Sequence, residues 1–193
     1  MPSTNSAQVG LKDLYYALLT KDDSTGVTYD TPQKLAPAVS ATVTPNVESA
    51  TDYADDGAFE TTNSLAAVDV SIETNQLPLD KQAALAGHTV ENGMLIKKST
   101  DISPYVALGF RSLKADGSEL YVWLYKGKFN PIETSLQTKG ESVEFQHPTI
   151  SGTFVKREHD DAWSISGDTS DTEFKLKNDW FTKVIEKDTT PTA

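Results

Sequence analysis

Apolar and polar side chains alternate with a period of two in several segments of the chain, which predicts half-buried β-strands. Valine and alanine alternate with serine and threonine in residues 38–47, and valine and isoleucine alternate with acidic and hydroxyl residues in 66–74. The alternation continues in residues 132–137 and 141–155, where Phe145 is predicted to face the core. The opposite, polar face comprises Ser40, Thr42, Thr44, Asp69, Ser71, Glu73, Glu133, Ser135, Glu144 and Gln146.

Residues 47–65 separate the first two of these strands and are polar and acidic. Asp56-Gly57, near their middle, suits a two-residue turn that requires positive φ, so the segment predicts one long, exposed hairpin. An isolated ribbon with so little apolar surface is not stable by itself. We therefore expect another surface to order it, with Tyr53 and Phe59 as apolar anchors.

A second hairpin is predicted over residues 104–129, again with an Asp-Gly turn, at 116–117. Both of its arms are apolar on both faces, and Tyr121, Trp123 and Tyr125 share one face of the second arm. A strand that is apolar on both faces needs two covers. We expect one cover to be the domain core and the other to be either a helix or a neighbouring subunit.

Residues 78–86 have a helical pattern that ends at Gly87, a favoured C-terminal stop. Leu79, Ala83 and Ala86 would share a face, so the helix should lie on a sheet. Residues 178–187 could be a short helix or a last strand. Further strands are predicted at residues 11–19, 93–98 and 162–166.

The predicted fold class is mainly β: a sandwich or barrel-like single domain with one short flanking helix and the long hairpin. The domain would span residues 1–193, with an N-terminal arm at 1–8 and a flexible C-terminal tail at 187–193. A length of 193 residues and a hydrophobic content of 37% are sufficient for one core.

The chain is acidic, with 28 acidic and 17 basic residues and a net charge of −11. Such a surface repels nucleic acid and anionic lipid. The acidity is concentrated in residues 1–75, which contain 11 acidic residues and three lysines. Residues 97–128 instead carry a local basic excess, from Lys97, Lys98, Arg111, Lys114, Lys126 and Lys128.

No motif predicts catalysis, and we expect neither an enzyme nor a cofactor or metal. The chain has no cysteine, which excludes a thiolate site. His159 lies between carboxylates in residues 158–161, but adjacent residues of an extended chain point to opposite faces, so this segment is interpreted as an exposed turn. The polar N-terminus lacks the features of a signal peptide, and we expect synthesis in the cytoplasm and no membrane partner.

The order of these elements, together with the strings VGLKDLYYALLT, YVALGFR and LYVWLYKGKF, resembles the major tail protein family of siphophages of Gram-positive hosts. The resemblance covers roughly residues 9–186. It implies a tail-tube fold that forms hexameric rings, stacked into the DNA conduit of the virion tail, with an extended loop between rings. Implied partners are other copies of the chain and the tape-measure, tail-terminator and distal tail proteins, while DNA passes without specific binding.

Two surfaces acquire roles from this resemblance. The ten polar strand residues above would line the lumen. The hairpin would dock on an adjacent subunit or ring, and the six basic residues of 97–128 would form its complementary surface. The hairpin residues proposed for this contact are Glu48, Asp52, Tyr53, Asp55, Asp56, Gly57, Phe59 and Glu60.

Two other functions stay open. The first is a monomeric β-sandwich module that binds carbohydrate or a host surface through Tyr121, Trp123 and Tyr125, because aromatic side chains stack on sugars. The second is a small hydrolase with an unrecognised carboxylate pair, although no acidic pair in the sequence has supporting residues.

Overall fold

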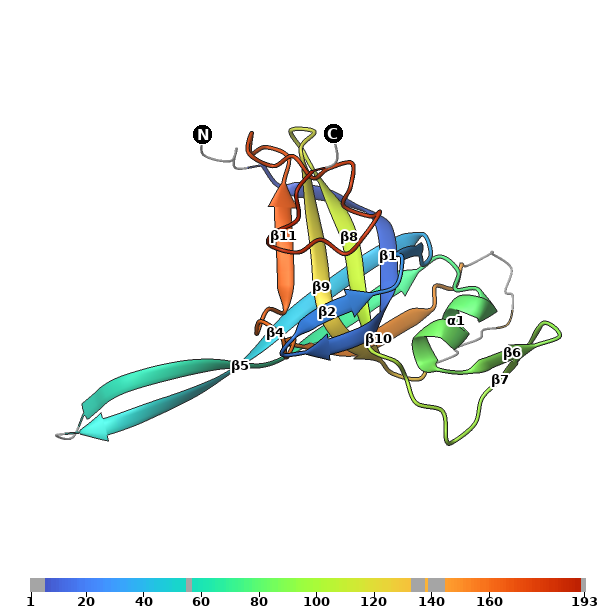
Figure 1. The fold of residues 1–193 in the computed structure, drawn as a ribbon, viewed down its shortest axis with the longest axis horizontal. Coiled ribbons are helices and arrows are strands. Elements are labelled where there is room, and N and C mark those ends of the chain that lie inside the picture. Colours follow the sequence, from blue (N-terminus) through green and yellow to red (C-terminus); the bar gives the residue numbers. More distant parts are fainter. Residues whose placement is uncertain (1–5, 55–56, 133–137, 139–144, 192–193) are drawn as a thin grey trace.

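The alternating segments pair into one curled antiparallel sheet that bends into a half-barrel (Figure 1). The computed structural model describes residues 6–54, 57–132, 138 and 145–191. The elements are β1 (Gln8–Asp23), β2 (Gly26–Tyr29), β3 (Gln33–Lys34), β4 (Ala38–Ala54), β5 (Gly57–Thr74), α1 (Leu79–Ala86), β6 (Thr89–Glu91), β7 (Met94–Ile96), β8 (Val106–Lys114), β9 (Glu119–Phe129), β10 (Thr149–Val155) and β11 (Ser164–Asp168).

The sheet has the strand order β2-β1-β8-β9-β10-β5-β4, with β3 paired to β1 and β11 paired to β9. β6 and β7 form a small separate hairpin. The predictions of a mainly β fold with one short helix and of strands at 11–19, 38–47 and 66–74 are confirmed, although several strands are longer than predicted, and β11 overlaps only the second half of the strand predicted at 162–166.

The two faces of β8 and β9 pack into different clusters, as their two-sided apolar pattern predicted. Leu108 and Leu124 lie in the main core, whereas Tyr121 and Trp123 lie in a second, aromatic cluster. Between Leu124 and Gly127, β9 carries one more residue than the paired part of β8, which is a β-bulge. Beyond the bulge the odd-numbered residues of β9 face the other side of the sheet, so Phe129 points into the main core.

The C-terminal segment, residues 169–187, covers the aromatic cluster, so the expected cover by the helix or a neighbouring subunit is wrong. The indole N–H of Trp123 donates to the carbonyl of Trp180 at 2.9 Å, and the hydroxyl of Tyr125 donates to that of Ile185 at 2.9 Å. The segment is neither helix nor strand, contrary to the prediction for 178–187. Two of its backbone carbonyls accept hydrogen bonds from side chains of the sheet, in place of the backbone hydrogen bonds of a regular helix or strand.

Helix α1 ends at Gly87, which has the left-handed φ of 72° that the sequence suggested. Ala83 and Ala86 are buried as predicted, but Leu79 is 45% exposed and Leu85 is fully buried instead. Leu77, just before the helix, also lies in the main core.

The strands predicted at 132–137 and 141–155 lie partly outside the described residues, which omit 133–137 and 139–144. In the part that is described, Phe145 is 82% exposed, so its predicted inward orientation is wrong. Strand β10 begins only at Thr149, immediately after Pro148, whose fixed φ and missing N–H disfavour a continuous ladder.

The outer halves of β4 and β5 leave the body as a long two-stranded ribbon (Figure 1). The register between these strands shifts between Asn46 and Val47, where the ribbon leaves the sheet. Pro45 lies just before this shift, on a strand at the edge of the sheet, where a missing N–H is tolerated.

Candidate assembly site

The polar residues of β4 and β5 form one continuous exposed face with those of β10. Ser40 lies opposite Glu73, Thr42 opposite Ser71, and Thr44 opposite Asp69. On the far side of β5, Ser151 and Thr153 of β10 extend these rows. The face encloses a shallow hollow of about 260 Å³. We call it the polar strand face, and its described members are Ser40, Thr42, Thr44, Asp69, Ser71, Glu73, Ser151 and Thr153.

The carboxylates of the polar strand face are held by neutral donors. Asp69 accepts hydrogen bonds from Asn46 at 2.7 Å and from Thr153 at 3.1 Å, and Glu73 accepts one from Ser40 at 3.1 Å. Neither carboxylate forms an ion pair with a described residue. Their negative charge is therefore oriented but not neutralised.

Six of the ten residues predicted for this face thus lie together on it. Gln146 lies outside any strand, in the segment before β10, and Glu133, Ser135 and Glu144 are outside the described residues. Ser151 and Thr153 were missed, although the alternation of Thr149–Val155 carries the same signal: buried Ile150, Gly152 and Phe154 alternate with exposed Thr149, Ser151 and Thr153.

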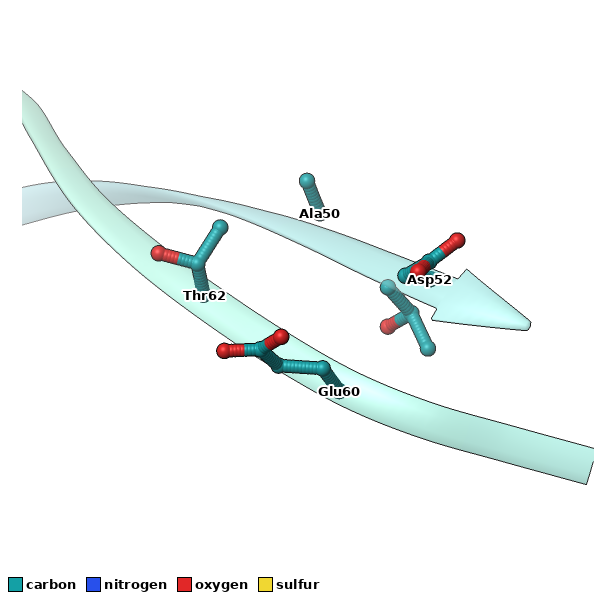
Figure 2. Close-up of a pocket in the computed structure, with 5 residues that line it drawn as sticks. Ala50, Asp52, Glu60 and Thr62 are labelled. Carbon is teal, nitrogen blue, oxygen red and sulfur yellow. The ribbon is translucent and has the colours of Figure 1, made fainter. Parts of the chain in front are cut away.

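The projecting hairpin has a polar acidic face that nothing in the described chain neutralises. Glu48 faces Ser64 and Asp52 faces Glu60, so three carboxylates line one face of the ribbon. Figure 2 shows Asp52 and Glu60 on adjacent strands near the tip. Like charges directly opposite each other destabilise a strand pair.

Both predicted anchors of the hairpin are exposed, Tyr53 at 73% and Phe59 at 76%. Gly57 begins β5 at the tip, and Asp55 and Asp56 are outside the described residues. Large aromatic side chains this exposed at the end of a ribbon have no core of their own to enter.

The six predicted basic residues do not form one free surface. Arg111 pairs with Asp13 at 2.5 Å and with Glu119 at 2.6 Å. Lys114 pairs with Asp168, and Lys126 with Asp22 at 2.6 Å. Lys128 lies over the ring of Tyr105, 4.4 Å from its centroid. Lys97 and Lys98 are exposed in the loop after β7 and form no ion pair with a described residue.

A buried arginine contacts both the sheet and Glu186 of the C-terminal segment, 3.9 Å away, and sequence reasoning did not identify it. Arg157 is 2% exposed, lies 3.8 Å from the centroid of the Tyr125 ring, and donates to Asp160 from Nε at 3.0 Å. Burial alone would raise the pKa of Asp160, but the hydrogen bond from Arg157 lowers it below its usual value. Burial raises the pKa of Tyr29, which accepts a bond from the same guanidinium.

The aromatic residues on which the alternative binding module depended are covered within the chain. Tyr121, Trp123 and Tyr125 are each at most 2% exposed beneath the C-terminal segment, and offer no stacking surface for a sugar. Residues 158–161 form an exposed turn in which Asp160 and Asp161 bind Arg157 and Lys156. The described residues contain no cluster of three or more metal-ligating side chains.

Among the residues with defined positions, no helix is long and apolar enough to cross a membrane. Comparison with known proteins adds no relative: no family model matches the chain, and no curated protein matches it significantly in sequence.

Proposed function

We propose that this chain is a non-catalytic structural subunit that assembles with copies of itself into stacked rings and forms the tail tube of a long-tailed bacteriophage. The observation that carries the proposal is the combination of the polar strand face with a hairpin that projects from the same two strands, β4 and β5. The host-cytoplasmic synthesis, the virion location and the tail partners follow from this proposal.

The polar strand face has the chemistry that a DNA conduit requires. A surface of hydroxyl groups and unneutralised carboxylates repels phosphate, and the cation beside it, Lys128 opposite Thr153, lies over the ring of Tyr105. Asp69 and Glu73 are fixed by Asn46, Thr153 and Ser40, so they cannot turn away from the face without losing hydrogen bonds. Facing a lumen, these residues let DNA pass without binding.

The edge of the sheet supports ring formation. On its outer side, β4 pairs with no described strand, so its backbone N–H and C=O groups are available to a neighbouring chain. Unpaired edges are an aggregation hazard that closure into a ring removes. Contacts between rings are head-to-tail and propagate into a tube until another protein ends it.

Electron microscopy of the purified protein tests the proposal. We expect hollow tubes with a regular axial repeat at high protein concentration. Single particles that stay monomeric at all concentrations and salt conditions would overturn it, and glycan binding by those monomers would favour the alternative module.

A further inference from the structure

The two ends of the molecule along its longest axis differ in charge and both expose apolar side chains. The hairpin tip lies at one end, and the β6-β7 hairpin with α1 lies at the other (Figure 1). Complementary surfaces at opposite ends of one molecule can join copies head to tail.

The tip carries acid and aromatic groups together. Asp52 and Glu60 face each other there, and Tyr53 and Phe59 flank them. Repulsion between the two carboxylates is relieved if cations approach the tip.

The opposite end carries cations beside an exposed aliphatic side chain. Lys97 and Lys98 are exposed in the loop after β7, and Ile102 is 77% exposed in the same loop. We call these three residues the basic loop patch. Of the six basic residues suggested by the sequence, only Lys97 and Lys98 are exposed and form neither an ion pair nor a ring contact with the described residues, although the carboxylate of Asp101 lies near Lys98.

The loop that carries the patch is held rigidly. Asp101 accepts the backbone N–H of Lys98 at 2.8 Å and bonds Nδ1 of His88 at 2.7 Å. The Ile102 backbone packs so closely on Gly87 that a Cβ there would lie 2.2 Å from the Ile102 carbonyl oxygen. A preorganised surface loses little conformational entropy on binding.

We infer that the hairpin tip of one copy docks on the basic loop patch of a second copy. The face of the tip that carries Asp52 and Glu60 meets Lys97 and Lys98, while Tyr53 and Phe59, which alternate with these carboxylates along the ribbon, lie at the margin of the contact beside Ile102. This inference names the receptor of the hairpin and rests on the proposed self-assembly. Of the basic surface predicted from the sequence, the inferred contact keeps only the two lysines. Arg111, Lys114 and Lys126 take no part in it, because each already forms an ion pair within the chain.

Because the chain has no cysteine, the contact can be tested by site-specific crosslinking. Phe59→Cys and Ile102→Cys are prepared as separate proteins, mixed in equal amounts and treated with a short bismaleimide. We expect covalent heterodimers linked through these two positions, identified by mass spectrometry. Val9→Cys, at a position on β1 that is 66% exposed against 77% for Ile102, replaces Ile102→Cys as the control and should give several-fold less product.

A charge exchange gives a second, independent readout. Lys97→Glu with Lys98→Glu should raise the critical concentration for assembly about tenfold, because like charges then meet at the contact. Asp52→Lys with Glu60→Lys should have a similar effect, and the protein with all four changes should recover assembly. Lys175→Glu with Lys183→Glu, which changes the same charge at exposed positions of the C-terminal segment, is the matched control.

The outcomes separate this inference from the proposed function. Tubes that form without the Phe59–Ile102 crosslink, or four changes that fail to restore assembly, would overturn the docking while the tube function stands. Crosslinked oligomers that never become tubes would support the docking and count against the tube. Links mainly between two Phe59→Cys chains would replace the inferred contact with a tip-to-tip one.

Discussion

Gly109 lies directly opposite Trp123 across β8 and β9, and a Cβ at position 109 would come within 2.8 Å of the indole ring. The absence of a side chain at Gly109 lets the tryptophan lie flat on the neighbouring strand. The ring then reaches the carbonyl of Trp180 and joins the C-terminal segment to the sheet.

Gly109→Ala should therefore destabilise the fold by about 1–3 kcal/mol, because the indole must move in a filled cluster. Urea unfolding measures the change. Gly10→Ala is the control, since its nearest contacts would be at an ordinary 3.7 Å and its effect should stay within about 0.5 kcal/mol. Equal effects at both positions would mean that the contact with Trp123 is not the cause.

Arg157→Ala should reduce the free energy of unfolding by about 2–3 kcal/mol, because the substitution removes a desolvated cation from the Tyr125 ring and leaves space beneath the C-terminal segment. Lys156→Ala, at the preceding position, removes an exposed ion pair with Asp161 and should change stability by less than about 1 kcal/mol. The difference in the free energy of unfolding between the two variants measures how much the buried arginine stabilises the fold. A difference near zero would contradict this structural role.

Acid should destabilise the fold through Asp22. This carboxylate accepts the backbone N–H of Glu158 at 3.0 Å and pairs with Lys126 at 2.6 Å. Burial alone would raise its pKa, but the bonds from Glu158, Lys126 and His159 lower the pKa below its ordinary value of 3.8. A group with a lowered folded pKa stabilises the protein above its unfolded pKa, and that contribution is lost as the pH falls through the folded pKa.

Asp22→Asn should thus lose about 2 kcal/mol at pH 7 and show a shallower decline in stability below about pH 4 than the unmodified chain. Denaturant midpoints measured from pH 7 to pH 3 test this. Asp161→Asn, at an exposed carboxylate, should leave the profile almost unchanged. Parallel profiles for Asp22→Asn and the unmodified chain would rule out the Asp22 contribution.

Lysine at Asp69, Glu73 and Glu144 should still permit tubes but slow the passage of DNA. Each cation near a phosphate adds an attraction that weakens with salt, so the delay should be greatest at low ionic strength. Glu173→Lys provides a charge change at an exposed position outside the polar strand face. DNA ejection rates that are equal for all variants across a salt series would show that the face does not line the lumen.

Deletion of residues 50–62 should leave a folded subunit with an unchanged thermal transition that no longer forms long tubes. The deleted part lies outside both hydrophobic clusters, so its loss removes no core contact. Normal polymerisation of the shortened chain would remove the docking role of the hairpin. Failure to fold would instead show that the hairpin contributes to the stability of the domain.

Local patterns in the sequence determined the strands at 38–47 and 66–74, the helix end and six members of the polar strand face. Alternation in 38–47 and 66–74 depends only on the period of a strand, so it predicted which side chains share a face. Gly87 was predictable because the left-handed end of a helix favours glycine whatever packs on it. The two-sided apolar pattern of β8 and β9 likewise required two covers.

Only the tertiary structure decided which groups meet. Lys126 pairs with Asp22 and Lys114 with Asp168, partners far apart in sequence, so a basic stretch that looked free is mostly neutralised. The cover of Trp123 is an irregular segment whose carbonyls are fixed by ring donors, and such a segment has no period to detect. Periodicity reports the local geometry of the backbone, whereas pairing and cover depend on how distant segments pack, which no local pattern contains.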